Sequence, residues 1–357
     1  MASTNEGNEE LRLAASLLEF YYGQSMSVGA IRSGHYRLTR KPLLLRLLSL
    51  LESRGRVYIE RRPRLEDGHL RTSIADQDIV FFDTFPTIRR RTLLYKTAVE
   101  YGDHTINHVL GCAHGCNYPC YAMQMSKRYG RVSSCEDWMY PRMVGNAIEL
   151  LDKEIPLLNS KIQFVHLSFM TDPFMYDAVN KRNFPWVQNL TLEIIRHLNQ
   201  ADIKVTVLTK GRLPIDLKNE PFNKENEYGI TLVSLSPAFQ KHYEPFSYPA
   251  GKRLAALRVL HGAGLKTWVS LEPYPTPNII EQDLTKLLNK ISFVDKLIFG
   301  KWNYNPEVNG YESHRRFYTR SSDTVIDFCR EHDIALHIKE HTPRSRHSTQ
   351  GLFVREV

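Results

Sequence analysis

The sequence has little cysteine and no long hydrophobic run. Its 357 residues include only five cysteines, too few and too clustered for the disulfide framework of a secreted protein. No apolar run approaches the ~18 residues that a membrane-spanning helix needs, and residues 1–10 are polar and acidic, unlike a signal peptide. The sequence therefore predicts a cytoplasmic protein with no membrane partner.

The composition allows a full core but says little about partners. A hydrophobic content of 42% is enough for one large domain with an appendage, or for two domains. The formal net charge of +8 permits an anionic partner such as nucleic acid. Net charge reports on non-specific attraction, so this signal is weak by itself.

Three of the five cysteines, Cys112, Cys116 and Cys120, fall within nine positions. This crowding favours a shared metal centre over disulfides. A 4Fe-4S cluster takes four ligands, so a three-cysteine loop leaves one iron open to a small molecule. The alternative is zinc held by the same thiols and His114, but structural zinc sites usually join two ligand pairs across an intervening segment.

From about Thr92 the sequence alternates apolar strands with amphipathic helices, which is typical of βα units and a parallel sheet. We expect an α/β fold with a partial (β/α)6 barrel over residues 92–340. The expected strands are 105–110, 162–169, 204–208, 228–235, 266–271, 296–299 and 335–338, and the main helices 142–155, 186–199, 250–263, 281–290 and 322–331. Functional residues should gather at the carboxyl ends of these strands.

Before the barrel, the pattern predicts a small α+β module over residues 11–91, after a disordered tail at residues 1–10. Helices from Leu11, at 27–31 and at 43–51, then strands at 57–59 and 70–74, follow the order of a winged helix. Basic residues concentrate there: Arg32, Arg37, Arg40, Lys41, Arg46, Arg54, Arg56, Arg61, Arg62 and Arg64. They suit either nucleic-acid phosphates or a solvated surface. Residues 341–357 are expected to form a C-terminal tail.

The cysteine loop resembles a known family. The stretch from Asn107 to Tyr118, followed by Cys120-Tyr-Ala, is similar to the cluster loop of radical S-adenosylmethionine (SAM) enzymes, in the branch typified by spore photoproduct lyase. The spacing here is C-x3-C-x3-C, where the family has C-x3-C-x2-C, as though Pro119 were inserted. The resemblance implies a 4Fe-4S cluster, SAM cleaved to a 5′-deoxyadenosyl radical, hydrogen abstraction from an unidentified substrate, and a flavodoxin- or ferredoxin-like electron donor.

The resemblance also covers short motifs at the strand ends, over about residues 104–305. Thr171-Asp-Pro-Phe, Thr209-Lys210 and Glu244-Pro followed by Arg253-Leu match stretches of the branch, and Lys210 is its candidate for the SAM carboxylate. The expected cofactor contacts are Tyr118, Tyr121, Ser168, Thr171, Asp172, Lys210, Ser234, Ser236 and Glu272. Each also has a structural interpretation, such as a turn cap for Asp172. Cys135 is a candidate hydrogen donor, and Cys329 is expected in the core.

Two other functions are compatible with the sequence. The first is a zinc-containing nucleic-acid-binding protein without radical chemistry. The second is a barrel whose cluster is structural or transfers electrons, which the extra Pro119 favours.

Overall fold

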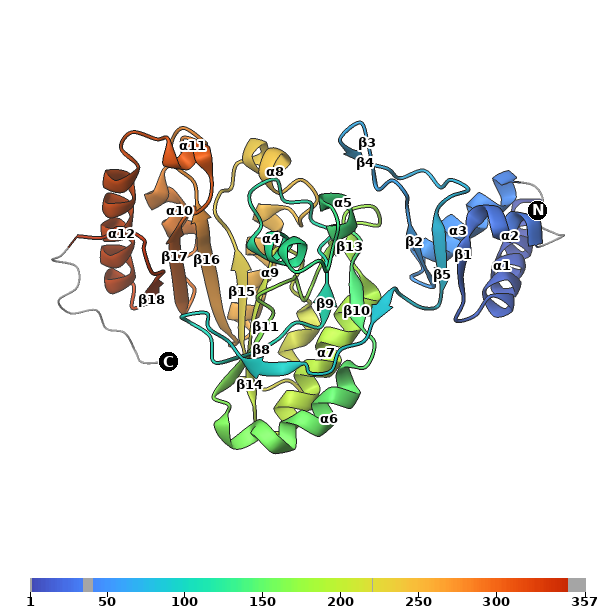
Figure 1. Ribbon diagram of the computed structural model, residues 1–357, viewed down its shortest axis with the longest axis horizontal. Coiled ribbons are helices and arrows are strands. Elements are labelled where there is room, and N and C mark those ends of the chain that lie inside the picture. The colour runs from blue at the N-terminus through green and yellow to red at the C-terminus, as the bar shows by residue number, and fades with distance from the viewer. Residues whose placement is uncertain (1, 35–40, 220, 346–357) are drawn as a thin grey trace.

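The computed structural model describes residues 2–34, 41–219 and 221–345, with side chains left out at 2–9 and 159. A small N-terminal module lies at one end of a larger α/β domain (Figure 1). No helix in these described ranges is long and apolar enough to span a membrane.

The large domain is built on an eight-stranded sheet of order β18-β17-β16-β15-β14-β11-β8-β7. All neighbouring pairs are parallel except β7 with β8. The strands are β7 (Leu94–Lys96), β8 (His104–Ile106), β11 (Phe164–Leu167), β14 (Lys204–Thr209), β15 (Glu227–Thr231), β16 (Lys266–Tyr274), β17 (Lys296–Lys301) and β18 (Ala335–Ile338). The parallel strands follow one another in chain order, so each connection returns the chain to the edge of the sheet where the strands begin.

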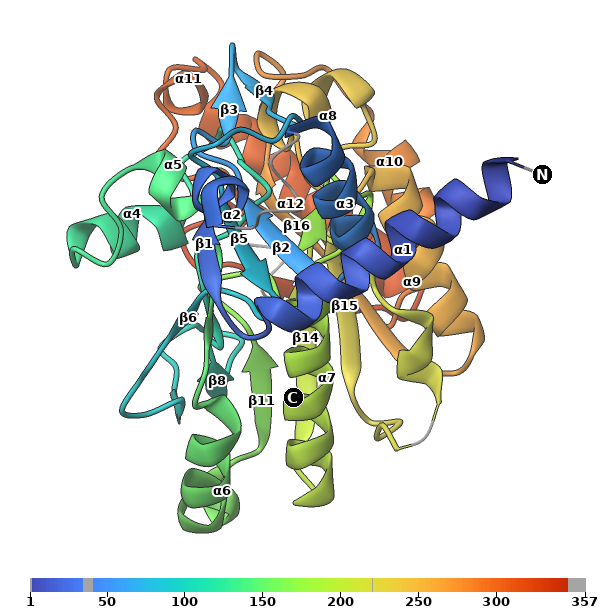
Figure 2. The same ribbon diagram turned by 90° about the vertical axis from the view of Figure 1, so that its right-hand side faces the viewer.

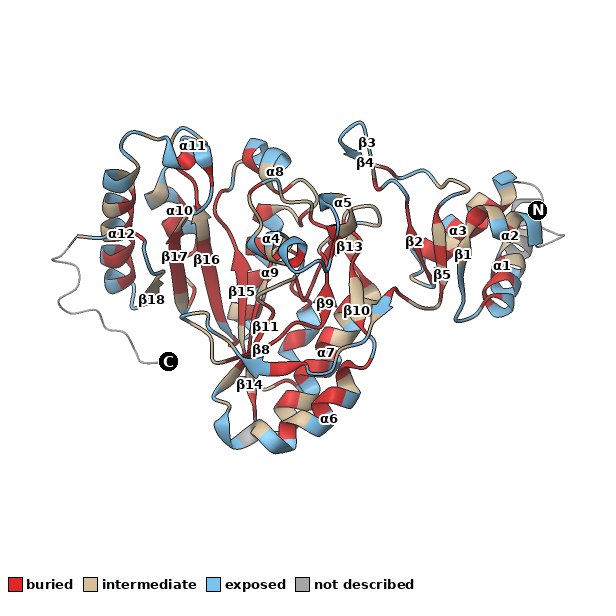
Figure 3. Cartoon of the chain, viewed as in Figure 1, coloured by how far each residue is buried: buried red, intermediate tan, exposed pale blue. Residues whose placement is uncertain are grey.

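Helices cover one face of this sheet and leave the other to polar and aromatic side chains. The covering helices are α6 (Ala147–Leu158), α7 (Pro185–Gln200), α9 (Ala250–Gly262), α10 (Leu284–Lys290) and α12 (His314–Glu331). Val165 and Val205 belong to the core beneath them. Because side chains alternate along a strand, His166 and Thr206 face the other way, where they are also buried. Figure 3 shows the strands as the most buried part of the molecule.

The parallel α/β sheet confirms the expected fold class, but several boundaries were wrong. The seven parallel strands correspond to the seven that the sequence predicted. The first expected strand is divided into β8 and β9 (Val109–Leu110), because β9 leaves the main sheet to pair with β10 (Arg142–Val144). Residues 142–144, expected to begin a helix, are that strand. A third strand, β6 (Thr87–Ile88), completes this small sheet.

The N-terminal module has the order helix, strand, two helices, strand, hairpin, strand. Its elements are α1 (Ala2–Phe20), β1 (Ser25–Ser27), α2 (Val28–Gly34), α3 (Lys41–Ser53), β2 (Val57–Glu60), the hairpin β3 (Leu65–Glu66) and β4 (His69–Leu70), and β5 (Ile79–Phe82). Strands β1, β5 and β2 form an antiparallel sheet. Leucines of α3 pack with α1 and the sheet in a separate core, and Figure 2 shows α1 crossing beside α3.

Two expectations for the module were wrong, and some residues named from the sequence lie outside the described ranges. Helix α1 covers residues 2–10, where a disordered tail was predicted. The strand that returns to β2 is β5, not residues 70–74, because Asp67 and Gly68 take positive φ and close only a short hairpin. Arg37 and Arg40, and residues 346–357 of the predicted tail, lie outside the described residues.

Most of the basic residues that the structure describes in the module form ion pairs with acidic side chains. Arg32 and Lys41 pair with Asp76, Arg46 with Glu10, Arg56 with Asp83, Arg61 with Glu52 and Arg62 with Glu60. Asp76, Asp83 and Glu10 are distant in sequence from the arginines that they pair with, so these ion pairs could not be predicted. The module therefore presents much less free positive charge than its sequence suggests.

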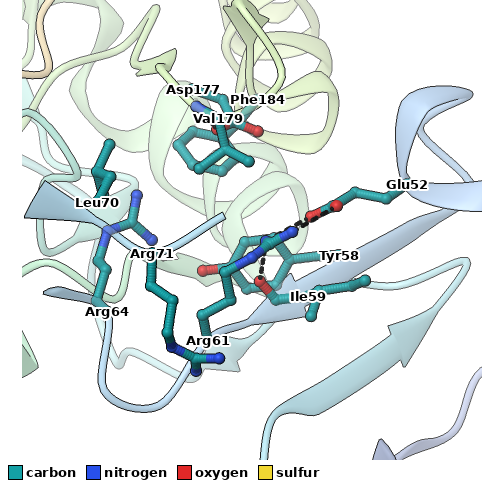
Figure 4. Close-up of a pocket in the computed structure, with 10 residues that line it drawn as sticks. All are labelled: Glu52, Tyr58, Ile59, Arg61, Arg64, Leu70, Arg71, Asp177, Val179 and Phe184. Atoms are coloured by element: carbon teal, nitrogen blue, oxygen red, sulfur yellow. Dashed lines mark hydrogen bonds and ion pairs between the residues drawn. The ribbon is translucent and has the colours of Figure 1, made fainter. Parts of the chain in front are cut away.

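The module is fastened to the large domain by polar and aromatic contacts. Arg182 of the large domain donates from Nη1 to the carbonyl of Ser53 at 2.9 Å and from Nη2 to that of Glu52 at 2.5 Å, and so caps the C-terminal end of α3. Close by, Tyr58 packs against Phe184, with ring centroids 5.8 Å apart. Figure 4 shows this junction, where Arg61 binds Glu52 on the module side and Asp177, Val179 and Phe184 face it.

The tight contact between Gly229 on β15 and Trp268 on β16 gives a test of the packing in the large domain. A Cβ at Gly229 would lie 2.3 Å from Cε2 of the buried Trp268 ring. We expect Gly229→Ala to lower the free energy of unfolding by about 1–3 kcal/mol, because the ring has no room to withdraw. Urea unfolding followed by fluorescence measures this. The matched control is Gly251→Ala on α9, where a Cβ meets nothing within 4 Å and stability should be kept or slightly raised. Equal free energies of unfolding for the two variants would contradict the tight packing of Trp268 on Gly229.

Candidate functional site

The cysteine loop lies at the edge of the sheet where the parallel strands end. It begins directly after β9 and leads into α4 (Tyr121–Arg128). Gly111 and Gly115 take φ values of +91° and +57°, which glycine adopts at little cost. Neighbours also crowd both positions, since a Cβ would lie 2.7 Å from the Trp138 carbonyl at Gly111 and 2.6 Å from the Phe246 ring at Gly115. The loop can therefore curl closely against the segments around it.

Backbone hydrogen bonds fix the loop from two sides. The amide of Cys112 donates to the Trp138 carbonyl at 2.8 Å, at the end of α5 (Cys135–Trp138). On the other side, the amide of Asn117 donates to the Tyr243 carbonyl at 3.0 Å, at the end of α8 (Pro237–Tyr243). The loop thus has a defined path between α5 and α8.

A buried ion pair holds the aromatic residue of the loop. The hydroxyl of Tyr118 donates to Oε1 of Glu244 at 3.1 Å, and the other oxygen of Glu244 pairs with Arg253. Glu244 and Arg253 are 2% and 1% exposed. Burial works against ionisation of Glu244, but Arg253 and then Lys210 outweigh it and lower the pKa of this carboxyl. Both members of the pair come from the Glu-Pro and Arg-Leu motif, which the sequence singled out without giving it a role.

Asp172 joins the ends of two strands. Its Oδ1 accepts from the Thr209 hydroxyl at 2.6 Å, and its Oδ2 accepts from the Lys210 amide at 2.6 Å. Oδ1 also accepts from the amide of Phe174 at 3.0 Å, which is the turn cap that the structural interpretation described. Gly211 lets these strand ends meet, because a Cβ there would lie 1.8 Å from the carbonyl oxygen of Phe174.

His114 is occupied away from the thiols. Its Nε2 accepts from the amide of Tyr176 at 2.9 Å, and its Nδ1 lies 3.6 Å from Oδ2 of Asp172. Burial lowers the pKa of this imidazole to about 4, against the opposing effect of Asp172. Because its Nε2 lone pair accepts from the Tyr176 amide, His114 links the loop to the segment after β11. The Cys3His zinc set considered from the sequence is not assembled among the described residues.

The three thiols and Lys210 fit a metal cluster that has an open position. Within the described residues, no three His, Cys, Asp or Glu side chains are grouped so as to hold one metal ion, whereas a multi-iron cluster takes thiols that stand further apart. Burial raises the pKa of the Cys116 thiol to about 12, although Lys210 lowers it, so metal binding must displace protons. The ammonium of Lys210 lies 5.4 Å from the centroid of the Tyr118 ring.

The predicted hydroxyl residues lie at the same edge, but each has a local partner. Ser168 bonds to Thr171 through its hydroxyl, with the Thr171 amide 3.1 Å away. Ser234 accepts from the amide of Ser236 at 3.1 Å, and Ser236 caps α8 by accepting from Phe239. These bonds shape the strand ends and leave lone pairs on Thr171 and Ser234 for a ligand.

Glu272 belongs to a charged group that the sequence did not reveal. Its Oε1 lies 3.1 Å from Nζ of Lys339, and Glu100 approaches the same ammonium at 3.7 Å. Burial raises the pKa of Glu272, against the effect of Lys339. Nothing in the local sequence of Lys339 shows that β18 lies beside β17 and brings this lysine close to Glu272.

The remaining predicted residues are spread more widely. Tyr121 begins α4 and is 59% exposed, so its ring faces solvent and not an enclosed cavity. Cys135 begins α5 and is also exposed, which is a poor setting for a thiol that must donate hydrogen in a shielded site. Cys329 is buried in α12, as expected, and burial raises its pKa to about 12. The structure thus gathers Tyr118, Asp172 and Lys210 around the cysteine loop, and leaves Tyr121 and Cys135 outside.

Comparison with known proteins gives relatives of unknown function and one informative fold. No family model matches the chain. An uncharacterised protein of Methanocaldococcus jannaschii is 24% identical over 265 residues, which cover 70% of this chain and 94% of the relative. An uncharacterised protein of Acidianus two-tailed virus is 27% identical over 197 residues, which cover 52% of this chain and 60% of the relative.

Among solved structures, a mutant of spore photoproduct lyase superposes with a TM-score of 0.52 at 14% identity, covering 71% of this chain and 80% of that one. A second mutant, with bound AdoMet and dinucleoside spore photoproduct, gives a TM-score of 0.51 at 16% identity over the same shares of both chains. The likeness covers about seven tenths of this chain and shows a common fold. This is the fold that the resemblance of the cysteine loop implied.

The pair of Glu244 and Arg253 should be essential to the site's stability. We expect Glu244→Gln to cost about 3–5 kcal/mol, because it leaves the buried Arg253 without its countercharge. Denaturant unfolding measures the loss. Glu149→Gln serves as the control, since Glu149 forms an exposed pair with Lys153 that contributes little. A Glu244→Gln protein as stable as the control would show that Arg253 finds compensation elsewhere.

Proposed function

We propose that this protein, whose large domain has the fold of spore photoproduct lyase, is a radical SAM enzyme built on a partial barrel. The observation that carries the proposal is the set of three thiols on one loop at the strand ends, where the Nε2 of His114 is used by the Tyr176 amide. Cys112, Cys116 and Cys120 would hold a 4Fe-4S cluster with one iron open. When bound, this cluster and SAM supply a 5′-deoxyadenosyl radical that abstracts hydrogen from the substrate.

In this proposal, the residues around the loop position the cofactor. Lys210 offers its ammonium to the carboxylate of SAM, beside the Tyr118 ring on which it lies. Thr171 and Ser234 offer hydroxyls from beyond the ends of β11 and β15, which lie on either side of β14. Asp172 acts through Thr209 and the Lys210 amide, so it is a positioning residue.

Glu272, on β16, is a further candidate contact of the cofactor in this proposal. Its carboxylate lies beside Lys339, so its negative charge is offset. The electron would come from a flavodoxin- or ferredoxin-like protein.

The N-terminal module is proposed to be a winged helix, on the strength of its element order and its antiparallel sheet. The ion pairs of its basic residues argue against a general nucleic-acid surface on this module. We therefore assign it to packing against the large domain. The nature of the substrate must be sought on other surfaces.

The decisive experiment uses protein reconstituted anaerobically with iron and sulfide and reduced with dithionite. We expect an electron paramagnetic resonance signal that changes when SAM is added, and 5′-deoxyadenosine detectable by chromatography. Cys116→Ala should lose both, because it removes a cluster ligand. Cys135→Ala is the matched control, since this thiol is exposed, and it should keep both.

Two other results would overturn the proposal in different ways. Stoichiometric zinc without a cluster signal would favour the zinc-containing nucleic-acid-binding protein. A cluster signal that SAM leaves unchanged would indicate that the longer C-x3-C-x3-C spacing supports only a structural or electron-transfer cluster.

A further inference from the structure

Two arginines without carboxylate partners face a small cavity beside the cysteine loop. Arg90 lies in the connector between the module and the sheet, and Arg131 follows α4. Both line a cavity of about 10 Å³ together with Ser126 and Thr171. No hydrogen bond or ion pair within the described residues engages either guanidinium, although Arg131 lies 5.5 Å from the ring centroid of Tyr129.

Hydrogen bonds fix the backbone of Arg90, so the position from which its side chain extends is defined. Asn146 accepts from the Arg90 amide at 3.1 Å and donates to the Arg90 carbonyl at 2.9 Å. The adjacent Arg89 differs, because its guanidinium lies 3.5 Å from Glu149 on the surface. Arg91 is exposed. Of this run of three arginines, Arg90 alone lines the cavity.

The surroundings of Arg90 are electropositive. Burial lowers the pKa of Arg90 against the opposing effect of Tyr95, and Arg131 adds to the lowering. Burial and then Arg90 lower the pKa of His108 to about 3. A guanidinium that is partly removed from water normally has an anion beside it, because unpaired buried charge is costly.

Ser126 supplies an independent sign of a missing partner. Its side chain is 1% exposed, and its Oγ has no hydrogen-bond partner, whereas buried polar atoms nearly always have one. The same hydroxyl lines the cavity with the two arginines. Two cationic groups and a free buried hydroxyl are together the donor set for an oxyanion.

We infer that this cavity is a phosphate subsite, in which Arg90, Arg131 and Ser126 hold a phosphate group of the substrate beside the cysteine loop. A cavity of about 10 Å³ takes little more than one water-sized group. One phosphate oxygen would enter toward Ser126 while the others meet the arginines at the mouth, where Arg131 is exposed. Because Leu110 and Thr171 also line the cavity, the phosphate would lie next to the loop that begins at Gly111.

The surface outside the cavity indicates the source of the phosphate. Tyr129 is 62% exposed and lies beside Arg131, and Lys127 and Arg128 end the helix α4 just before it. Exposed aromatic rings among cations form the surface on which single-stranded nucleic acid stacks its bases. The phosphodiester of a single strand is therefore the source that this face favours, and a small phosphorylated molecule shares the same chemistry.

That the phosphate belongs to a substrate rests on the proposed function. Phosphate binding at the cavity, however, needs neither iron nor SAM. Binding is therefore measured on the protein without either cofactor. Failure of the subsite would appear in this assay, whereas failure of the radical chemistry would appear only in the reconstituted enzyme. The two proposals can then be judged separately.

The test compares Arg90→Gln and Arg131→Gln with Arg91→Gln, which removes the same charge outside the cavity. The first probe is a fluorescent thymidine oligonucleotide, followed by anisotropy at several salt concentrations. We expect the two cavity variants to weaken binding roughly tenfold or more, as for a charged hydrogen bond, and to lower the salt slope by about 0.7 for each lost contact. Arg91→Gln should change affinity by less than about threefold.

The second probe is inorganic phosphate, read as thermal stabilisation of the protein. Stabilisation that Arg131→Gln and Ser126→Ala abolish, without oligonucleotide binding, would support the subsite and assign it to a small phosphorylated molecule. Ser126→Ala removes only one hydroxyl, so it guards against a folding defect in Arg90→Gln. Equal effects of the cavity variants and Arg91→Gln with both probes would overturn the inference, and so would a protein that binds neither probe.

Discussion

The cysteine loop depends on a charge pair buried beneath it. Glu244 and Arg253 are both almost fully buried, and removing two such charges from water costs several kcal/mol for each ion. The cost is offset because each partner has further hydrogen bonds, from Tyr118 to Glu244 and from Arg253 to the Thr231 carbonyl at 2.9 Å. The pair therefore joins the loop to the end of β15. A loop made largely of small residues has few apolar contacts of its own that could replace this anchor.

A single carboxylate organises the other side of the site. Asp172 ties the turn after β11 to the end of β14 and lies beside His114 of the loop. Segments that are far apart in sequence thus share one acceptor group. This explains why an aspartate that caps its own turn, at Phe174, also determines where the Lys210 backbone lies. The structural and functional interpretations of Asp172 are two consequences of the same bonds.

The sequence predicted the large domain well, because strand and helix periodicity are local. The strand at 335–338 and the helix at 250–262 agree with the structure nearly residue for residue. The split between β8 and β9 was missed, since the strand pattern continues through Asn107 and gives no sign that the chain changes sheets. The pairing of Glu272 with Lys339 and of module arginines with Asp76 or Asp83 was missed because such partners meet only through tertiary folding.

The site was predicted as a list of residues but not as an arrangement. The three thiols were evident from their spacing, whereas the diversion of His114 to Tyr176 and Asp172 requires the fold. Tyr121 follows Cys120 directly, so its position suggested a cofactor contact. The start of α4 turns its ring outward instead. Neighbours in sequence share a location, but their directions depend on the backbone between them.

The aromatic junction between the two parts of the chain also closes the back of the cysteine loop. Tyr58 of the module and Phe85 of the connector share one apolar cluster with Phe184, Val109 and Ala113, and Cys112 packs against it. A boundary drawn at residue 91 would cut through this shared core. In a chain shortened to the barrel, the apolar side chains directly behind Cys112 would be exposed to water. The module therefore supplies part of the apolar wall behind the cysteine loop.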